Sequence, residues 1–167
     1  SFAHELGVRY SEGLYKNTFI GRTFIMPGQA ERKKSLKYKL VPQELEIRGK
    51  KVLIMDDSIV RGNTSREIVR MLKDFGAKEV YFAVACPPVK SPCFYGVDMP
   101  TKGELIAGNM DEEEIERYLD VDALLYQRID DLVEAVTRKG DHHIDTPCMA
   151  CLNGNYVAND IDDSIIT

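Results

Sequence analysis

Two adjacent carboxylates followed by a glycine-containing turn are the residues of this sequence best suited to chemistry. Asp56 and Asp57 come directly after the apolar run 52–55, and Gly62 follows a few residues later. Carboxylates in such a position can meet ribose hydroxyls or a hydrated Mg²⁺. Because burying two adjacent charges costs much free energy, at least one carboxylate is expected to face a cleft.

The segment after the acids, Ser58 to Ser65, is predicted to hold a phosphate group. It opens a predicted helix, whose first turn offers unpaired N–H donors and the positive end of the helix dipole. Gly62 lets the backbone approach an anion closely. Spacing alone leaves open an ordinary capped strand-to-helix turn. The predicted substrate-binding residues are Asp56, Asp57, Ser58, Ile59, Val60, Arg61, Gly62, Asn63, Thr64 and Ser65.

A strand–helix–strand unit is expected to position this segment. The unbroken apolar run 52–55 predicts a strand buried on both faces. Apolar residues at helical spacing predict a helix that ends at Gly76, and residues 79–86 predict a second buried strand. Such a unit makes the two strands parallel, and ligands bind at the carboxyl ends of parallel strands. The predicted fold class is therefore α/β with a parallel sheet.

The rest of the chain reads as further elements of one domain with a tail. The length of 167 residues suits one domain. Residues 1–140 are predicted to form a partial domain that includes a basic loop at about 19–39, and residues 141–167 an irregular tail. The smaller elements expected are a helix end at 1–7, a strand and turn at 44–51, a helix capped by Asp111, a strand at 123–126 and a helix at 130–137.

Composition excludes some function classes. The formal net charge of −5 argues against a broad nucleic-acid surface. No apolar run approaches the roughly 18 residues of a membrane span, and no signal peptide precedes the first motif. A cytoplasmic protein without nucleic-acid or membrane partners is expected. Because the chain begins with Ser1 rather than Met, we expect a fragment, a subunit or a processed chain.

The run from Asp56 to Gly62 resembles the phosphoribosyl pyrophosphate motif of type I phosphoribosyltransferases, in the form typical of the amidophosphoribosyltransferase family. Residues 12–17, 21–25, 94–100 and 104–107 are similar to other segments of that family. The resemblance implies a type I phosphoribosyltransferase fold that is incomplete at its N-terminal side. It places the phosphoribosyl pyrophosphate motif at residues 52–65.

The resemblance also implies an activity. The family forms 5-phosphoribosylamine for purine nucleotide biosynthesis from phosphoribosyl pyrophosphate and ammonia, which a glutaminase domain or subunit releases from glutamine. Asp56 and Asp57 would meet the ribose and Mg²⁺, while Arg22 and Lys16 would meet the pyrophosphate as the 19–39 loop closes. A sheet edge left open by missing strands would favour a homo-oligomer.

The cysteines suggest a second cofactor. The Cys148-x-x-Cys151 pair fits zinc, an iron–sulfur cluster or redox work. The resemblance to the iron–sulfur subset of the family adds Cys93 and implies that Cys93, Cys148 and Cys151 are ligands of a [4Fe–4S] cluster. Zinc and free thiols stay open as alternatives. Cys86, at the end of a predicted core strand, is expected to be simply buried.

Two other functions stay open at this point. A regulatory module could bind phosphoribosyl pyrophosphate without catalysis, because sensing needs only the phosphate-binding segment. A structural domain stabilised by a cluster or by zinc could have lost the ligand altogether. The intact stretch from Gly21 to Thr23 favours the enzyme over both.

Overall fold

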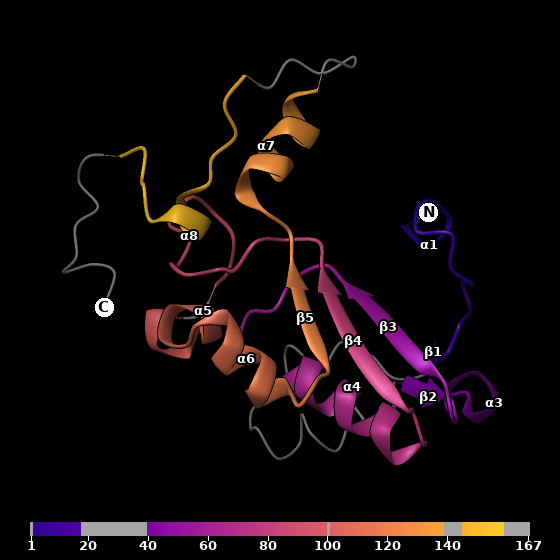
Figure 1. Cartoon of the computed structure of the whole chain (residues 1–167). Coiled ribbons are helices and arrows are strands. Elements are labelled where there is room, and N and C mark those ends of the chain that lie inside the picture. Colours follow the sequence, from indigo (N-terminus) through magenta and orange to yellow (C-terminus); the bar gives the residue numbers. More distant parts are fainter. Residues whose placement is uncertain (1, 18–39, 100, 139–144, 159–167) are drawn as a thin grey trace. The chain divides into compact units, whose positions relative to one another are not determined.

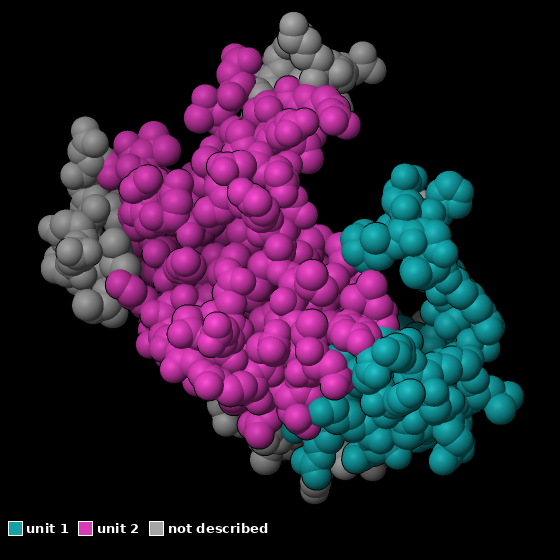
Figure 2. Space-filling model, in the orientation of Figure 1, with its two compact units in different colours: residues 1–52, 67–80 teal, residues 53–66, 81–167 magenta. Residues whose placement is uncertain are grey.

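The computed structural model describes residues 2–17, 40–99, 101–138 and 145–158 (Figure 1). The chain divides into two compact units (Figure 2): a first unit of residues 1–52 and 67–80, and a second unit of residues 53–66 and 81–167. The basic loop at 19–39 and the domain boundary at 140 lie outside the described residues.

The first unit contains a small antiparallel sheet. Its strands are β1 (Leu14–Lys16) and β2 (Leu40–Pro42), and Leu14 lies opposite Pro42. The N-terminal helix α1 (Phe2–Glu5) precedes them, and Gly7 follows that helix with a φ of 64°, as the sequence predicts. The backbone N–H of Gln43 donates to the carbonyl of Gly13 at 2.8 Å.

The prediction of a strand at residues 44–51 is wrong for its first half. Residues Glu44–Ile47 form the short helix α3, with only Ile47 buried. Glu44 pairs with Arg48, and Glu46 pairs with Lys50 at 3.1 Å, both at the i,i+4 spacing. Because Glu and Leu are good helix formers and such pairs add support, local preference favours the turn of helix over an extended strand.

The predicted parallel sheet is confirmed. It contains β3 (Lys51–Asp56), β4 (Glu79–Val84) and β5 (Ala123–Tyr126) in the order β3-β4-β5, and their arrows point the same way in Figure 1. β4 and β5 are parallel, with Tyr81 opposite Ala123 and Val84 opposite Tyr126. β4 is the central strand.

Burial on both faces is confirmed for β4 but wrong for β3. In β4, Val80 and Phe82 are fully buried and Val84 is nearly so. In β3 the burial alternates, so that Leu53 and Met55 keep 37% and 46% of their surface exposed. Because alternate residues of a strand point to opposite faces, one face of β3 is open in the described part of the chain.

The helices around the sheet largely match the prediction. They are α4 (Asn63–Asp74), α6 (Glu112–Leu119) and α7 (Ile129–Thr137). Asp111 caps α6 in a complete capping box with Glu114, and Ile115 and Leu119 are buried. The predicted irregular tail contains one turn of helix, α8 (Ala150–Asn153), and the segment before α6 contains η2 (Lys102–Glu104) and α5 (Ile106–Asn109).

A small apolar cluster holds the second unit together at the carboxyl ends of the strands. Val89, Leu105 and Leu152 are its buried members. Val60, which follows β3 in the chain, and Cys151 of α8 pack against them. The cluster thus joins the segment after β3 to the tail. Among the described helices, none is long and apolar enough to cross a membrane.

Candidate functional site

The paired acids end β3, as the sequence predicts. Asp56 is the last residue of the strand, and its carbonyl accepts a hydrogen bond from the N–H of Ala85 just after β4. Its carboxylate is partly buried, and this burial raises the pKa of Asp56, with the neighbouring charge of Asp57 adding to the effect. The N–H of Asp57 donates to Asp56 Oδ1 at 3.0 Å and partly offsets the rise.

Asp57 offers its carboxylate to solvent. Its side chain is exposed, and Ser58 Oγ donates to its Oδ1 at 3.2 Å. One carboxylate is therefore half-sheltered while its neighbour is free to meet a ligand. This arrangement agrees with the expectation that at least one of the two acids faces outward.

The strand-to-helix loop, residues 57–62, is anchored by its apolar side chains. Ile59 is 2% exposed, and Val60 packs on the apolar cluster that includes Leu105. The carbonyl of Val60 accepts a hydrogen bond of 2.9 Å from the N–H of Ile106. Since Ile59 is buried and Val60 is partly buried, a ligand of this loop would meet mainly the backbone of these two residues.

Gly62 occupies a position that strongly disfavours a side chain. Its φ is 75°, in the left-handed region that favours glycine. A Cβ there would lie 2.6 Å from Ile106 Cδ1 and 3.2 Å from Tyr118 Cε1. The glycine thus allows α5 and α6 to pack closely behind the turn. The first residue of α4, Asn63, follows this turn directly.

The start of α4 presents the donors that anion binding needs. Ser65 is buried at 3% exposure, whereas Asn63 and Thr64 are exposed. The N–H of Arg66 donates to the carbonyl of Gly62 at 2.9 Å, so the helical bonds begin there. The N–H groups at the beginning of a helix have no intrahelical partner, and the helix dipole places partial positive charge on them.

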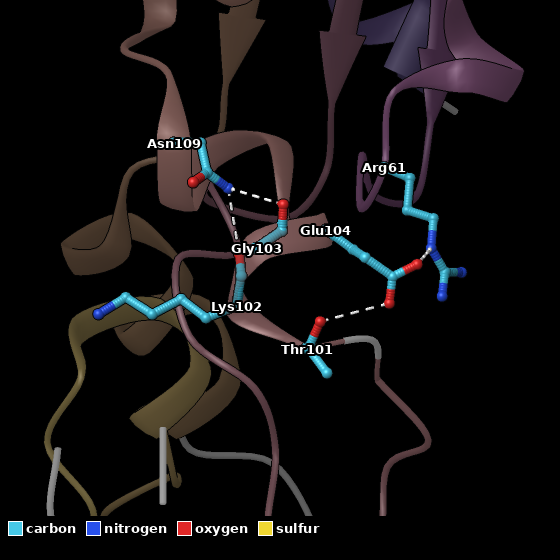
Figure 3. Close-up of polar contacts among 6 residues, drawn as sticks. All are labelled: Arg61, Thr101, Lys102, Gly103, Glu104 and Asn109. Atoms are coloured by element: carbon cyan, nitrogen blue, oxygen red, sulfur yellow. Dashed lines mark hydrogen bonds and ion pairs between the residues drawn. The ribbon is translucent and has the colours of Figure 1, made fainter. Parts of the chain in front are cut away.

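Two side chains from distant parts of the sequence contact this loop. Glu104 Oε1 accepts a hydrogen bond of 3.0 Å from Arg61 Nε, which also forms an ion pair (Figure 3). The guanidinium of Arg66 lies over the Tyr118 ring, with Cζ 4.7 Å from the ring centroid. Neither Glu104 nor Tyr118 was predicted as a site residue, because no local spacing connects them to the motif.

The structure leaves untested the two residues that are predicted to meet pyrophosphate. Lys16 is exposed and ends β1 in the first unit. Arg22 lies outside the described residues. The structure therefore brings together residues 56–65, while the roles of Lys16 and Arg22 stay predictions.

All four cysteines lie in the second unit, and Cys93 and Cys148 are near Cys151. The carbonyl of Cys151 accepts hydrogen bonds from the N–H groups of Lys90 and Ser91 at 2.9 and 3.0 Å, which joins the C-x-x-C segment to the chain before Cys93. Burial raises the pKa of Cys151, and the neighbouring Cys93 and Cys148 raise it further. All four thiols are free, and Cys86 is half-buried.

The described residues contain no ready-made metal site. No group of three or more His, Cys, Asp or Glu side chains in that part of the chain has the arrangement that holds a metal ion. A Mg²⁺ that arrives with a phosphorylated substrate needs only one or two protein carboxylates. The pair of Asp56 and Asp57 satisfies that lower requirement.

Comparisons with known proteins agree with this geometry. The family model described as "Phosphoribosyl transferase domain" matches residues 14–98. The amidophosphoribosyltransferase of Methanocaldococcus jannaschii is 48% identical over 93% of this chain and 32% of its own length. That of Pseudomonas aeruginosa is 48% identical over 98% of this chain and 32% of its own length. The chain thus spans about a third of the length of these curated relatives.

Two solved structures have a similar fold. A glutamine phosphoribosylpyrophosphate amidotransferase from Bacillus subtilis, complexed with ADP and GMP, superposes with a TM-score of 0.81 and 41% identity. The match covers 99% of this chain and 36% of that chain. A second structure, described as the allosteric regulatory enzyme of purine biosynthesis, matches with the same TM-score and 40% identity. The fold described above is therefore shared with solved enzymes over nearly all of this chain.

Proposed function

Because this chain belongs to the phosphoribosyl transferase domain family, we propose that its residues 56–65 bind phosphoribosyl pyrophosphate together with Mg²⁺. One observation carries the proposal. Paired acids at the carboxyl end of a parallel strand lead, through a glycine of positive φ packed against Ile106, into the first turn of a 12-residue helix. Ligands of parallel α/β sheets bind at this edge.

The substrate would divide between the two parts of the site. The 5-phosphate would lie at the start of α4, where backbone N–H groups and the hydroxyl of Thr64 can donate to it. The exposed carboxylate of Asp57 would accept hydrogen bonds from the ribose hydroxyls. The carboxylate of Asp56, at the end of the strand, would hold Asp57 by accepting its backbone N–H. Mg²⁺, when bound, would neutralise charge on the pyrophosphate leaving group.

We extend the proposal to the reaction of the whole protein. An amino group from ammonia would replace pyrophosphate at C1 of the ribose and give 5-phosphoribosylamine, the activity for which the relatives are named. Arg22 and Lys16 would meet the departing pyrophosphate. A glutaminase domain or subunit would supply the ammonia. Cytoplasmic location and self-association through the sheet edge at β3 belong to the same proposal.

The cysteines support a separate proposal of a [4Fe–4S] cluster. Cys93, Cys148 and Cys151 would supply three of its thiolates, because the Cys151 backbone joins their two segments and the three thiols are close enough to influence one another. Their present arrangement is not that of a metal site, so the side chains would have to turn inward on loading. Anaerobic reconstitution followed by iron and sulfide analysis tests this, and zinc bound in their place would contradict it.

The experiment that tests the substrate proposal is a calorimetric titration of this chain. Phosphoribosyl pyrophosphate with Mg²⁺ should give heat with one-to-one stoichiometry. Ribose 5-phosphate alone should compete, because it carries the 5-phosphate without the pyrophosphate. The absence of heat with both compounds would refute a ligand site at residues 56–65.

A further inference from the structure

The turn formed by η2 and α5 lies behind the strand-to-helix loop and contacts it at three successive residues. Ile106 donates its N–H to the carbonyl of Val60, and its side chain fills the space beside Gly62. Between these two contacts, Glu104 pairs with Arg61 at 3.0 Å. We call residues 101–110 the brace. These contacts span about forty residues of sequence, so they fix tertiary rather than local structure.

One side chain fixes the shape of the brace. Asn109 Nδ2 donates to the carbonyls of Lys102 and Gly103 at 3.1 and 3.2 Å (Figure 3), and to the carbonyl of Leu105 at 2.7 Å. These three carbonyls surround Glu104 in the chain. The two hydrogens of the amide are shared among these carbonyls, and those of Lys102 and Leu105 also accept backbone N–H groups, from Leu105 and Gly108. Several hydrogen bonds thus hold the backbone around Glu104.

Glu104 itself is held from both sides. Its Oε1 accepts from Arg61, and its Oε2 lies 3.5 Å from Thr101 Oγ1 (Figure 3). The Arg61 guanidinium lowers the pKa of Glu104, so the carboxylate is ionised at neutral pH. The pair is about half exposed, with 43% of the Arg61 side chain and 51% of the Glu104 side chain accessible.

We propose that Glu104 is a positioning residue of the substrate site: its carboxylate fixes Arg61, and through Arg61 the loop that receives the 5-phosphate, while Asn109 fixes the turn that carries Glu104. This inference rests on the proposed function of residues 56–65. It explains why an acid lies beside an anion site, where its charge alone would be unfavourable. Its cost in repulsion is offset by the order that it gives to the loop.

The direction in which one substitution changes the affinity for the anion distinguishes a positioning role from a simple effect of charge. Glu104→Gln removes a negative charge near the expected phosphate and keeps the shape of the side chain. If charge alone mattered, the anion would bind more tightly, and more so at low salt. If Glu104 positions Arg61, the anion should bind more weakly, by about 5-fold, as expected for losing one exposed charged pair.

The test is a double-mutant cycle measured by calorimetry with ribose 5-phosphate, which probes the phosphate position alone. The proteins are the wild type, Glu104→Gln, Arg61→Ala and the double variant, each checked for its fold by circular dichroism. Glu104→Gln should weaken binding in the wild type and have no further effect once Arg61 is removed. Asn109→Asp, which replaces the donor with an acceptor, should weaken binding in the wild type and much less in the double variant.

The outcomes distinguish this inference from the proposed function. If the wild type does not bind ribose 5-phosphate, the proposed function fails and the inference fails with it. If the wild type binds but Glu104→Gln binds equally well or more tightly, only the positioning role is refuted. An equal loss on Glu104→Gln with and without Arg61 also refutes it, because Glu104 would then act through the fold rather than through Arg61.

Discussion

The hydroxyl of Tyr118 donates a hydrogen bond of 3.1 Å to Asn63 Oδ1, although 55 residues separate them in the sequence. The ring of the same tyrosine lies beneath the guanidinium of Arg66. Tyr118 comes from α6, whereas Asn63 and Arg66 belong to the first turn of α4. One aromatic side chain thus supports the helix turn at which we expect the phosphate to bind.

Tyr118→Phe should cost less stability than Tyr118→Ala. The phenylalanine keeps the ring and loses one partly exposed hydrogen bond, which is worth about 1 kcal/mol. The alanine also loses the contact with Arg66 and the packing beside Gly62, so its cost should reach about 2–4 kcal/mol. Urea denaturation measures both. Equal losses would show that the ring contributes nothing.

Gly62→Ala should be strongly destabilising, because the new Cβ meets Ile106 and the backbone has a positive φ. The left-handed conformation costs about 1–2 kcal/mol, and overpacking adds about 1–3 kcal/mol. Gly49→Ala is the matched control, since Gly49 has a φ of 72° and nothing within 4 Å of an added Cβ. Urea midpoints should therefore fall further for Gly62→Ala. Equal shifts would contradict the close packing of α5 behind the turn.

Asp56→Asn should make the protein more stable at neutral pH. Burial raises the folded-state pKa of Asp56, so the folded state binds the proton more tightly than the unfolded state does. The contribution of this group to stability therefore falls as pH rises from the ordinary Asp value through the raised one. The variant lacks that loss and should show a higher urea midpoint at pH 7.

Asp57→Asn is the control for that experiment, because its carboxylate is exposed. It should leave the neutral-pH midpoint almost unchanged. NMR titration of the Asp56 carboxyl should also give a pKa above its usual range. A depressed pKa, or a lower midpoint for Asp56→Asn, would contradict the partial burial described above.

The cysteines should differ in their reaction with iodoacetamide near pH 7.5. The thiolate is the reacting form, and burial raises the pKa of Cys86 and Cys151. Cys148 is exposed and should be labelled first, as peptide mass spectrometry of a time course can show. If Cys151 were labelled as fast as Cys148, the half-buried position of Cys151 in α8 would be wrong.

Sequence patterns predicted the elements whose signals are local. The apolar run before Asp56 identified β3, and Asp111 as a capping residue identified the start of α6. The βαβ order predicted parallel strands because chain geometry leaves few alternatives. The placement of the paired acids at the end of β3 followed from these elements.

The predictions from the sequence that were wrong or missing have two physical causes. Residues 44–47 are a single turn of helix, which is too short to show a helical period, so ion pairs at i,i+4 decided the outcome. The apolar run in β3 could not reveal that Leu53 and Met55 face an open side, because exposure depends on neighbouring elements. Glu104 was missed as a contact of Arg61 because tertiary pairing leaves no trace in spacing.

Binding of phosphoribosyl pyrophosphate at residues 56–65 can be tested by calorimetric titration of the wild type and Asp57→Asn with this ligand and Mg²⁺. Because Asp57 is exposed, the variant should keep the fold of the protein while it lacks one charged hydrogen-bond acceptor. The wild type should bind, and Asp57→Asn should bind about 10-fold more weakly or worse, as expected for losing a charge-assisted hydrogen bond. Absence of binding by the wild type, or equal affinity of the two proteins, would contradict binding at these residues.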